Sequence, residues 1–500
     1  NPMLKTYFSV VIALGFVTIL TVTGCKSEED FRIERANNAR LHFEMAQFKE
    51  LAQDTRLTLP ECIRLAHENN LDAKVYKLEE AVAREMRTAE ILGMLPEINI
   101  NNNFTGRSNT PASSSKAYKA GGATYGASTS SDRNINAFNI DFALSVMDFG
   151  LAFFNSQQAH DRYLMRQQRS ERVSQNLTLD VVRVYFQVAA AQRAINITRG
   201  LLDTCRDRYT LIKRLSDAKK ITPFRAFDET SRFIEMERRL TGYILDYQNA
   251  CIELRSLLGY YPTANITVDD SVLAKVPEFK FPEMEVMEQI ALMKRPELYE
   301  IDMQKHINVV ECRKVLLSMF PSARLFADYN NNNNSFLYKQ NWWELGIQSA
   351  FNLLKVPQKI GEYMSYQAQV EAEQVRSYGQ AITVMAQVRI AHADILANKE
   401  ILDTNIRTFE NYNTHLTNSL KNQQITGDLP RLELDHIRLT TAESDIQRIM
   451  SLGNYYVSYY RLLNAIGIRS MTDNDLKALT EELNAAQGEA KKEIAKAEQK

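Results

Sequence analysis

The sequence predicts a mainly helical protein in which two tandem repeats each supply two strands to a membrane β-barrel and one long helical hairpin. Segments about 205 to 225 residues apart repeat one another, a period that indicates a duplicated domain rather than a solenoid unit. Val182-Arg183-Val184 recurs as Val388-Arg389-Ile390, and Ile221-Thr222 recurs as Ile425-Thr426. In each repeat a stretch with period-two alternation precedes a long stretch that is almost free of proline and glycine.

The N-terminus indicates export. Met3 and Lys5 precede an apolar run from Phe8 to Val22, which is typical of a signal peptide and short for a spanning helix. The run ends in Thr23-Gly24-Cys25 and is followed by polar residues, so we expect residues 1–24 to be a signal peptide and Cys25 to carry lipid, palmitate included. Residues 25–57 would then be a lipidated tether. The alternative is an uncleaved signal anchor with an incidental cysteine.

Composition excludes several functions. The formal net charge is −1, which gives no general attraction to nucleic acid. The other four cysteines have no metal-ligand spacing and the seven histidines are scattered, so we expect isolated buried thiols, ordinary helix histidines, no metal and no cofactor. A disulfide between Cys205 and Cys251 is disfavoured because the two lie at unequal distances from the hairpin tip near Ile221.

Strands are expected at about 96–106 and 136–148 in the first repeat and at about 321–331 and 341–353 in the second. Alternation is cleanest in the second strand of each repeat, where one face is apolar and the other polar. In a membrane barrel the apolar face meets lipid. The expected lipid-facing residues are Phe138, Ile140, Phe142, Leu144, Val146, Trp343, Leu345 and Ile347. The aromatic group Phe336, Tyr338, Trp342 and Trp343 would form an interfacial girdle. The alternative is an ordinary sheet packed on a soluble core.

The helical hairpins are expected at about 155–258 and 359–466. The first repeat then spans 58–262 and the second 285–470, joined by a linker at 263–284 and followed by a charged tail at 471–500 to which we assign no role in the core. Helices of roughly 65 residues are about 100 Å long and exceed any single globular core. They must pack side by side or form a tube.

Four strands cannot close a barrel, and an open strand edge cannot face lipid. Identical copies are the simplest source of further strands. Three copies supply twelve strands, so we expect a trimer with a 12-stranded β-barrel continuous with a periplasmic helical barrel.

At this point the chain resembles the TolC-type outer-membrane efflux family over about residues 57 to 470. Leu57-Thr58-Leu59-Pro60-Glu61-Cys62-Ile63 is similar to the opening motif of the family, and Asp148-Phe149-Gly150 is similar to its turn into the long helix. Residues 181–192 match its Val-x-x-x-Tyr-x-x-x-x-Ala motif, and Arg295-Pro296-Glu297-Leu298 matches the opening of its second repeat. Each motif is weak alone, whereas their order, spacing and duplication are specific.

The resemblance implies the passive exit duct of a tripartite efflux or secretion system, lipid-anchored in the bacterial outer membrane and extending into the periplasm. It implies no enzyme activity. The implied partners are two further copies of the chain, outer-membrane lipid, a periplasmic adaptor (membrane fusion protein), and an inner-membrane pump of the RND, ABC or MFS type.

The hairpin tips are implied to contact the adaptor and to narrow the tunnel. The implied tip residues are Lys220, Ile221, Thr222, Gln424, Ile425 and Thr426. Lys220 and Gln424 stand where the family usually has glycine, so both tips depart from the family pattern. Asp428 and Glu433 are the candidate pore constriction, since carboxylates that meet on an axis attract cations and repel one another. The alternative is that both are solvated acids at the start of a helix.

Three other classes are weaker. An enzyme is disfavoured because the sequence has no phosphate loop, nucleophile elbow or metal cluster. A periplasmic adaptor would have one hairpin beside a compact β domain, whereas here each hairpin follows its own strand pair. A structural coiled-coil lipoprotein leaves the amphipathic strands without a role. The sequence does not identify the cargo. Sixteen methionines raise the possibility of copper or silver export, but they form no ladder of repeated Met-x-x-Met motifs, which favours core packing.

Overall fold

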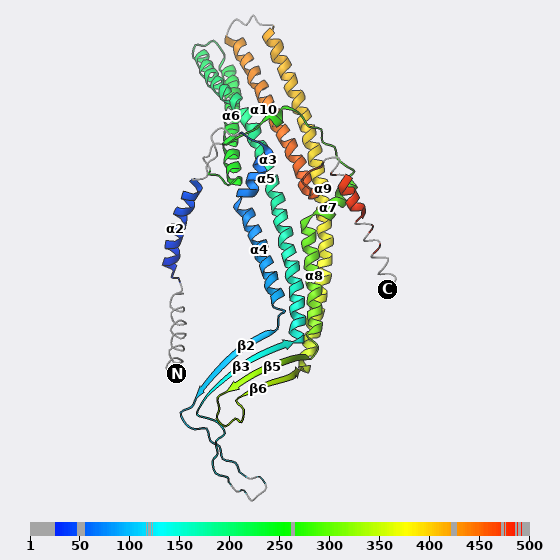
Figure 1. Ribbon diagram of the computed structural model, residues 1–500. Helices are drawn as coiled ribbons and strands as arrows, with labels where there is room; N and C mark the ends of the chain where they lie inside the picture. The colour runs from blue at the N-terminus through cyan, green and yellow to red at the C-terminus, as the bar shows by residue number, and fades with distance from the viewer. Residues whose placement is uncertain are drawn as a thin grey trace.

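The computed structural model describes residues 26–47, 56–116, 124–261, 266–421 and 428–471, with isolated positions or short stretches at 118, 122, 475, 477–485, 488 and 492. The molecule is long and narrow, with a four-stranded sheet at one end and two helical hairpins at the other (Figure 1). Cys25, Gln424, Ile425 and Thr426 lie outside the described residues.

The first repeat contains two short helices, two strands and a hairpin. It comprises α3 (Leu59–Asn69), α4 (Leu71–Leu92), β2 (Glu97–Gly106), β3 (Asn134–Ser145), α5 (Val146–Asp217) and α6 (Pro223–Leu257). Helix α3 begins after Thr58, whose backbone N–H donates to Glu61 Oε2 at 2.9 Å in a capping box. Helix α5 has 72 residues, which corresponds to roughly 110 Å.

The second repeat follows the same order. It comprises α7 (Met284–Lys294), α8 (Pro296–Leu317), β5 (Ser322–Asn332), β6 (Asn341–Ala350), the 3-10 helix η2 (Leu353–Lys355), α9 (Val356–Lys421) and α10 (Asp428–Ile466). The helices form one wall. In the half near the sheet the packing order is α4-α5-α8-α9, and in the half near the tips it is α6-α5-α10-α9.

The sheet has the strand order β2-β3-β5-β6 and is antiparallel throughout. Strand β3 pairs with β5 in a register that sets Phe142 opposite Ala327 and Ile140 opposite Tyr329. The two repeats are therefore joined side by side through their inner strands, and β2 and β6 are the edges.

A belt of small elements surrounds the middle of the wall. Strand β1 (Arg56–Leu57) pairs in parallel with β4 (Thr267–Val268), and η1 (Ser271–Ala274) follows. Underneath, α5 is buried over consecutive residues from Val181 to Ala190, apart from Arg183 and Gln187. The Tyr185 hydroxyl donates to the Asp269 carbonyl oxygen at 2.5 Å. The main core thus lies where belt, first repeat and second repeat meet.

Several boundaries differ from expectation. Strand β3 ends at Ser145, so Val146 is the first residue of α5 rather than a strand residue, because the Ser145 side chain accepts a hydrogen bond from the Asp148 N–H at 3.2 Å and caps the helix. Part of the expected linker is structured as β4 and η1.

The tail was expected to have no role in the core, and this is wrong for its described part. Leu483 is buried, and Lys294 Nζ forms an ion pair with Glu482 at 2.6 Å. The tether contains α2 (Glu28–Gln47), where Phe43 makes an edge contact with Tyr261. Among the described residues, no helix is long and apolar enough to cross a membrane.

Candidate functional site

The sheet has one continuous apolar face. The strand register places Ile98, Phe142, Ala327 and Leu345 in one row across all four strands. It places Ile100, Ile140, Tyr329 and Trp343 in the next row. Leu345 and Ile347 are exposed, and the aromatic rings of Tyr329 and Trp343 lie 5.2 Å apart. The expected apolar row of β3 thus extends across all four strands at Ile140 and Phe142, whereas the partners of Phe138 in the neighbouring strands are asparagines.

The opposite face is polar. One row runs Asn99, Asp141, Asp328 and Glu344, and Arg324 forms an ion pair with Asp141 at 2.6 Å. The neighbouring row contains three asparagines and ends in Trp342, so Trp342 lies on the polar face, not on the face of Trp343. The two adjacent tryptophans therefore lie on opposite faces of the sheet, because successive side chains of a strand alternate between the faces.

The helical wall leaves apolar stripes at its two edges. On one edge, α4 exposes residues spaced at three and four, and α6 exposes a corresponding set. These are Leu71, Val75, Leu78, Val82 and Met86 in α4, and Phe227, Ile234, Leu245 and Ile252 in α6. On the other edge α9 exposes Ile360, Met364, Val375, Tyr378, Ile382 and Leu396. Helical spacing places each stripe opposite the side that packs on the neighbouring helix of the same chain.

A buried guanidinium network holds the second repeat together. The Arg295 side chain is 2% exposed and donates to Glu297 through two hydrogen bonds of 3.0 Å. It also donates to Gln387 Oε1 at 2.7 Å and to the Ala465 carbonyl oxygen at 2.9 Å, at the end of α10. Arg172 of the first repeat approaches the same Glu297 at 2.7 Å. The Arg-Pro-Glu motif is thus a clamp between α8, α9, α10 and α5.

The first hairpin tip is a tight turn. Lys219 has φ 56°, and Lys220 N–H donates to the Leu215 carbonyl oxygen at 2.9 Å. Ile221 packs against the hairpin core, whereas Thr222 caps α6 by accepting a hydrogen bond from the Arg225 N–H at 3.3 Å. Of the expected contact residues in this tip, Lys220 and Thr222 are exposed and Ile221 is half-buried.

The second tip is described only at its ends. Asp428 begins α10, and Glu433 lies within the first two turns with an exposed side chain. Below the tips, ion pairs join the two hairpins of one chain. Arg208 approaches Asp435 at 2.6 Å, and Arg239 approaches Glu443 at 2.5 Å.

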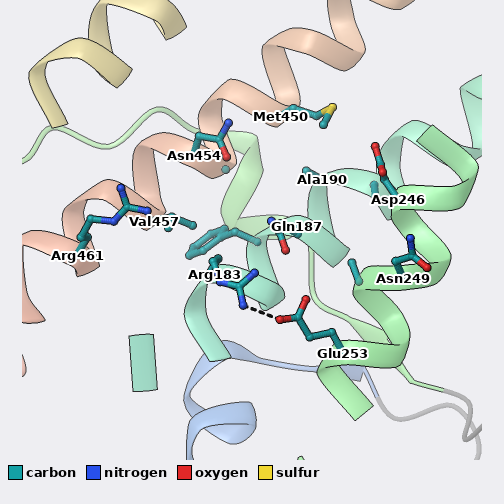
Figure 2. Close-up of a pocket in the computed structure, with 14 residues that line it drawn as sticks. Arg183, Gln187, Ala190, Asp246, Asn249, Glu253, Met450, Asn454, Val457 and Arg461 are labelled. Atoms are coloured by element: carbon teal, nitrogen blue, oxygen red, sulfur yellow. Dashed lines mark hydrogen bonds and ion pairs between the residues drawn. The ribbon is translucent and has the colours of Figure 1, made fainter. Parts of the chain in front are cut away.

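A cavity of about 480 Å³ lies where the two hairpins diverge (Figure 2). Phe186, Met450 and Val457 form its apolar lining, and Arg183 pairs with Glu253 across its mouth at 2.5 Å. Its polar side chains come from α5, α6 and α10 and include amides such as Asn249 and Asn454. This mixture suits contact with solvent or solutes and provides no nucleophile–base pair.

The thiols and imidazoles are parts of packed helices. Cys62, Cys205 and Cys251 are buried and, like the half-buried Cys312, free. Burial raises the pKa of the Cys62 thiol to about 12, so it does not act as a nucleophile. Burial also lowers the pKa of His436, helped by Arg232. Among the described residues, no group of three or more His, Cys, Asp or Glu side chains is placed to hold a metal ion.

Sequence reasoning missed the apolar stripes of α4, α6 and α9, the role of Arg295, and the ion pairs between hairpins. The Arg-Pro-Glu motif was visible, but its partners are up to 170 residues away in the chain. The spacing of Leu71, Val75, Leu78 and Val82 was a readable signal of a coiled-coil seam.

The chain thus combines a sheet that has an apolar face and two unpaired edges with helices far longer than a globular core needs. Comparisons with known proteins find the same combination. Residues 62–260 match the family model described as outer membrane efflux protein. Among curated protein sequences none matches.

Solved structures share the fold over most of their length. The outer-membrane channel OprN is 14% identical with a TM-score of 0.62, and the alignment covers 82% of this chain and 89% of that one. The open state of the Neisseria gonorrhoeae MtrE outer membrane channel is 15% identical with a TM-score of 0.63, covering 82% and 89%. The Campylobacter jejuni CmeC outer membrane channel is 14% identical with a TM-score of 0.61, covering 85% and 89%.

The family model thus matches the first repeat of this chain, and the solved structures show that most of the chain shares the fold of outer-membrane channels. The expected fold of the single chain, with two strand pairs and two long helical hairpins, is therefore confirmed, whereas the trimer and the closed barrel stay predictions.

Proposed function

We propose that this chain is the passive outer-membrane exit duct of an efflux system. Three copies would close into one tube, with the α4, α6 and β2 edge of each copy packed against the α9 and β6 edge of the next. The observation that carries this proposal is the pair of exposed apolar stripes on opposite edges of one wall. Two different edges that meet form a heterologous interface, and such an interface closes into a ring when the rotation between neighbouring copies is one third of a turn for three copies. Strand β2 of one copy would pair with β6 of the next.

The apolar face of the sheet would then face lipid and the polar face would line the barrel. The proposed lipid-facing residues are Phe138, Ile140, Phe142 and Leu144 of β3 and Trp343, Leu345 and Ile347 of β6. All of them except Phe138 lie in apolar rows, and Phe138 is included because it lies on the same face of β3. Val146 is not retained in this group, since it begins α5. Asp141, paired with Arg324, would face the water-filled lumen.

Lipidation of Cys25 is part of the proposal. A diacylglyceryl and N-acyl group, palmitate among the chains, would anchor the N-terminus beside the barrel and would assist attachment that the strands already provide. Mass spectrometry of the mature N-terminal peptide tests this. An unmodified cysteine, or cleavage at another position, contradicts it.

The hairpin tips would meet a periplasmic adaptor, which in turn would connect to an inner-membrane pump of the RND, ABC or MFS type. Lys220, Ile221 and Thr222 in the first tip, with Gln424, Ile425 and Thr426 in the second, are the proposed contacts. The exposed Lys220 and Thr222 support this role for the first tip.

Asp428 and Glu433 remain the proposed constriction. Three copies of each acid near one axis would favour cations and would attract trivalent cations as blockers. Single-channel conductance of the purified trimer in a planar bilayer tests both the duct and the gate. We expect an open or blockable pore in the wild type, and weaker cation selectivity after Asp428→Asn with Glu433→Gln. Unchanged selectivity and block would place the constriction elsewhere, whereas the absence of any pore would contradict the duct.

A further inference from the structure

The two hairpin tips of one chain differ in the charge of their sequences. In the first tip, residues 213–225 contain five cations and one carboxylate. The equivalent residues of the second tip, 417–429, contain one of each. In a ring of three copies, six tips would alternate between strongly basic and neutral. We propose that the first tip alone recognises an acidic surface on the periplasmic partner, and that the second tip contributes little to this recognition.

The first-tip surface consists of residues that are all exposed: Lys213, Arg214, Lys219, Lys220, Phe224 and Arg225. The Phe224 side chain is 82% exposed at the start of α6, beyond the last cations of α5. An exposed aromatic ring surrounded by cations is complementary to an apolar recess surrounded by carboxylates. The expected partner is therefore a protein whose contacting end combines acidic side chains with an apolar recess. The recognition proposal rests on the proposed function as a duct, which would place the tips in the periplasm, facing a partner.

The backbone of the turn provides independent support. Lys219 is the only described non-glycine residue with positive φ, at 56°. Glycine adopts this conformation without steric cost, whereas lysine does not. A strained residue kept in a turn that glycine would relax indicates that its side chain has a use. The hydrogen bonds from Lys219 N–H to Ser216 and from Lys220 N–H to Leu215, both 2.9 Å, hold the two lysines in fixed positions.

The experiment uses the full-length trimer in detergent. The probe is a synthetic helical-hairpin peptide whose loop carries four glutamates around one leucine, and the control peptide carries four lysines instead. We expect the wild type to bind the glutamate peptide, more weakly at high salt because exposed charges are screened. Lys219→Glu with Lys220→Glu should weaken binding about tenfold or more. The matched reversal in the second hairpin, Lys421→Glu with Arg431→Glu, should leave binding within about twofold.

Lys219→Gly separates recognition from folding. It should raise the midpoint of unfolding, because it removes the strain, and yet weaken peptide binding. A variant that gains stability and binds as well as the wild type would overturn the proposal. So would equal binding of both peptides, equal losses from the two charge reversals, or tighter binding to phosphatidylglycerol vesicles than to the glutamate peptide.

Pore formation in a planar bilayer is measured on the same samples. If the wild type conducts but does not prefer the acidic peptide, the recognition proposal fails and the duct stands. If the wild type forms no pore, the duct fails, and the proposal fails with it.

Discussion

Replacing Arg295 by methionine tests the buried clamp between the two repeats. Methionine keeps the length of the side chain and removes the guanidinium. Two acceptors then lose their donor, the Ala465 carbonyl oxygen and Gln387 Oε1. Glu297 retains Arg172 at 2.7 Å, and the Asn464 carbonyl oxygen retains Arg172 Nη1 at 3.2 Å.

The expected loss of stability follows from these lost hydrogen bonds. Each buried acceptor left without a donor costs about 1–3 kcal/mol, so we expect Arg295→Met to lower the free energy of unfolding by about 3 kcal/mol. Arg172 is more exposed, at 17%, and Arg172→Met leaves Glu297 paired with Arg295, so about 1 kcal/mol is expected. The double variant leaves Glu297 without either guanidinium, and its loss should exceed the sum of the single losses by about 1 kcal/mol or more.

The assay is guanidinium unfolding of the purified protein in detergent, followed by far-ultraviolet circular dichroism. Protein concentration must be held fixed, because assembly adds to apparent stability. A loss below about 0.5 kcal/mol for Arg295→Met would refute the clamp, since that is the range of ordinary surface substitutions. Strict additivity in the double variant would show that the two guanidinium groups do not share Glu297.

The remaining predictions concern the sheet, a histidine and a thiol. Phe142→Arg should destabilise the assembled barrel by about 2–4 kcal/mol if the residue lies near the bilayer midplane, whereas Asp141→Ala should have a small effect. The temperature at which the trimer dissociates on gels compares the two variants. A larger loss for Asp141→Ala than for Phe142→Arg would show that the two faces are exchanged. Burial lowers the pKa of His436, so near pH 6.5 and below the unfolded chain takes up a proton at this residue more readily than the folded chain does. The free energy of unfolding should therefore fall as the pH falls from 7.5 to 5.5. The same pH dependence in the wild type and in a His436→Gln variant would contradict this. Because the pKa of the Cys62 thiol is raised to about 12, a thiol reagent at pH 8 should modify Cys62 only after the protein unfolds. Mass spectrometry measures this modification. Modification of Cys62 in the native protein would contradict the prediction and show that the helices around it open.

Much of the fold could be predicted because its elements have strong local signals. The alternation in β3 predicted both faces of the strand, and the register then extends those faces to Ile98 and Leu345. The end of β3 was harder to predict. Apolar alternation continues into Val146, and only the capping side chain of Ser145 marks the change to helix.

The candidate site was predictable only in part, because its parts depend on long-range contacts. Helical periodicity shows that α9 has apolar stripes, but not which stripe is covered inside one chain and which is left at an edge. The Leu483 side chain is buried, although the tail around it is rich in Ala, Glu and Lys. The ion pair between Arg208 and Asp435 joins residues of different repeats and leaves no local trace in the sequence.

Closure of three copies through unlike edges can be tested by one cross-link. Val75 lies 22 residues before β2 begins at Glu97, and Val375 lies 25 residues after β6 ends at Ala350. With a rise of about 1.5 Å per residue, the two valines stand at nearly the same height above the sheet on opposite edges. Both side chains are exposed in the single chain. We predict that a Val75→Cys, Val375→Cys double variant, oxidised in membranes, gives covalent species up to three chains and no larger, while each single variant stays monomeric on a denaturing gel. Covalent dimers from a single variant, or a ladder that continues beyond three chains, would contradict the closed trimer.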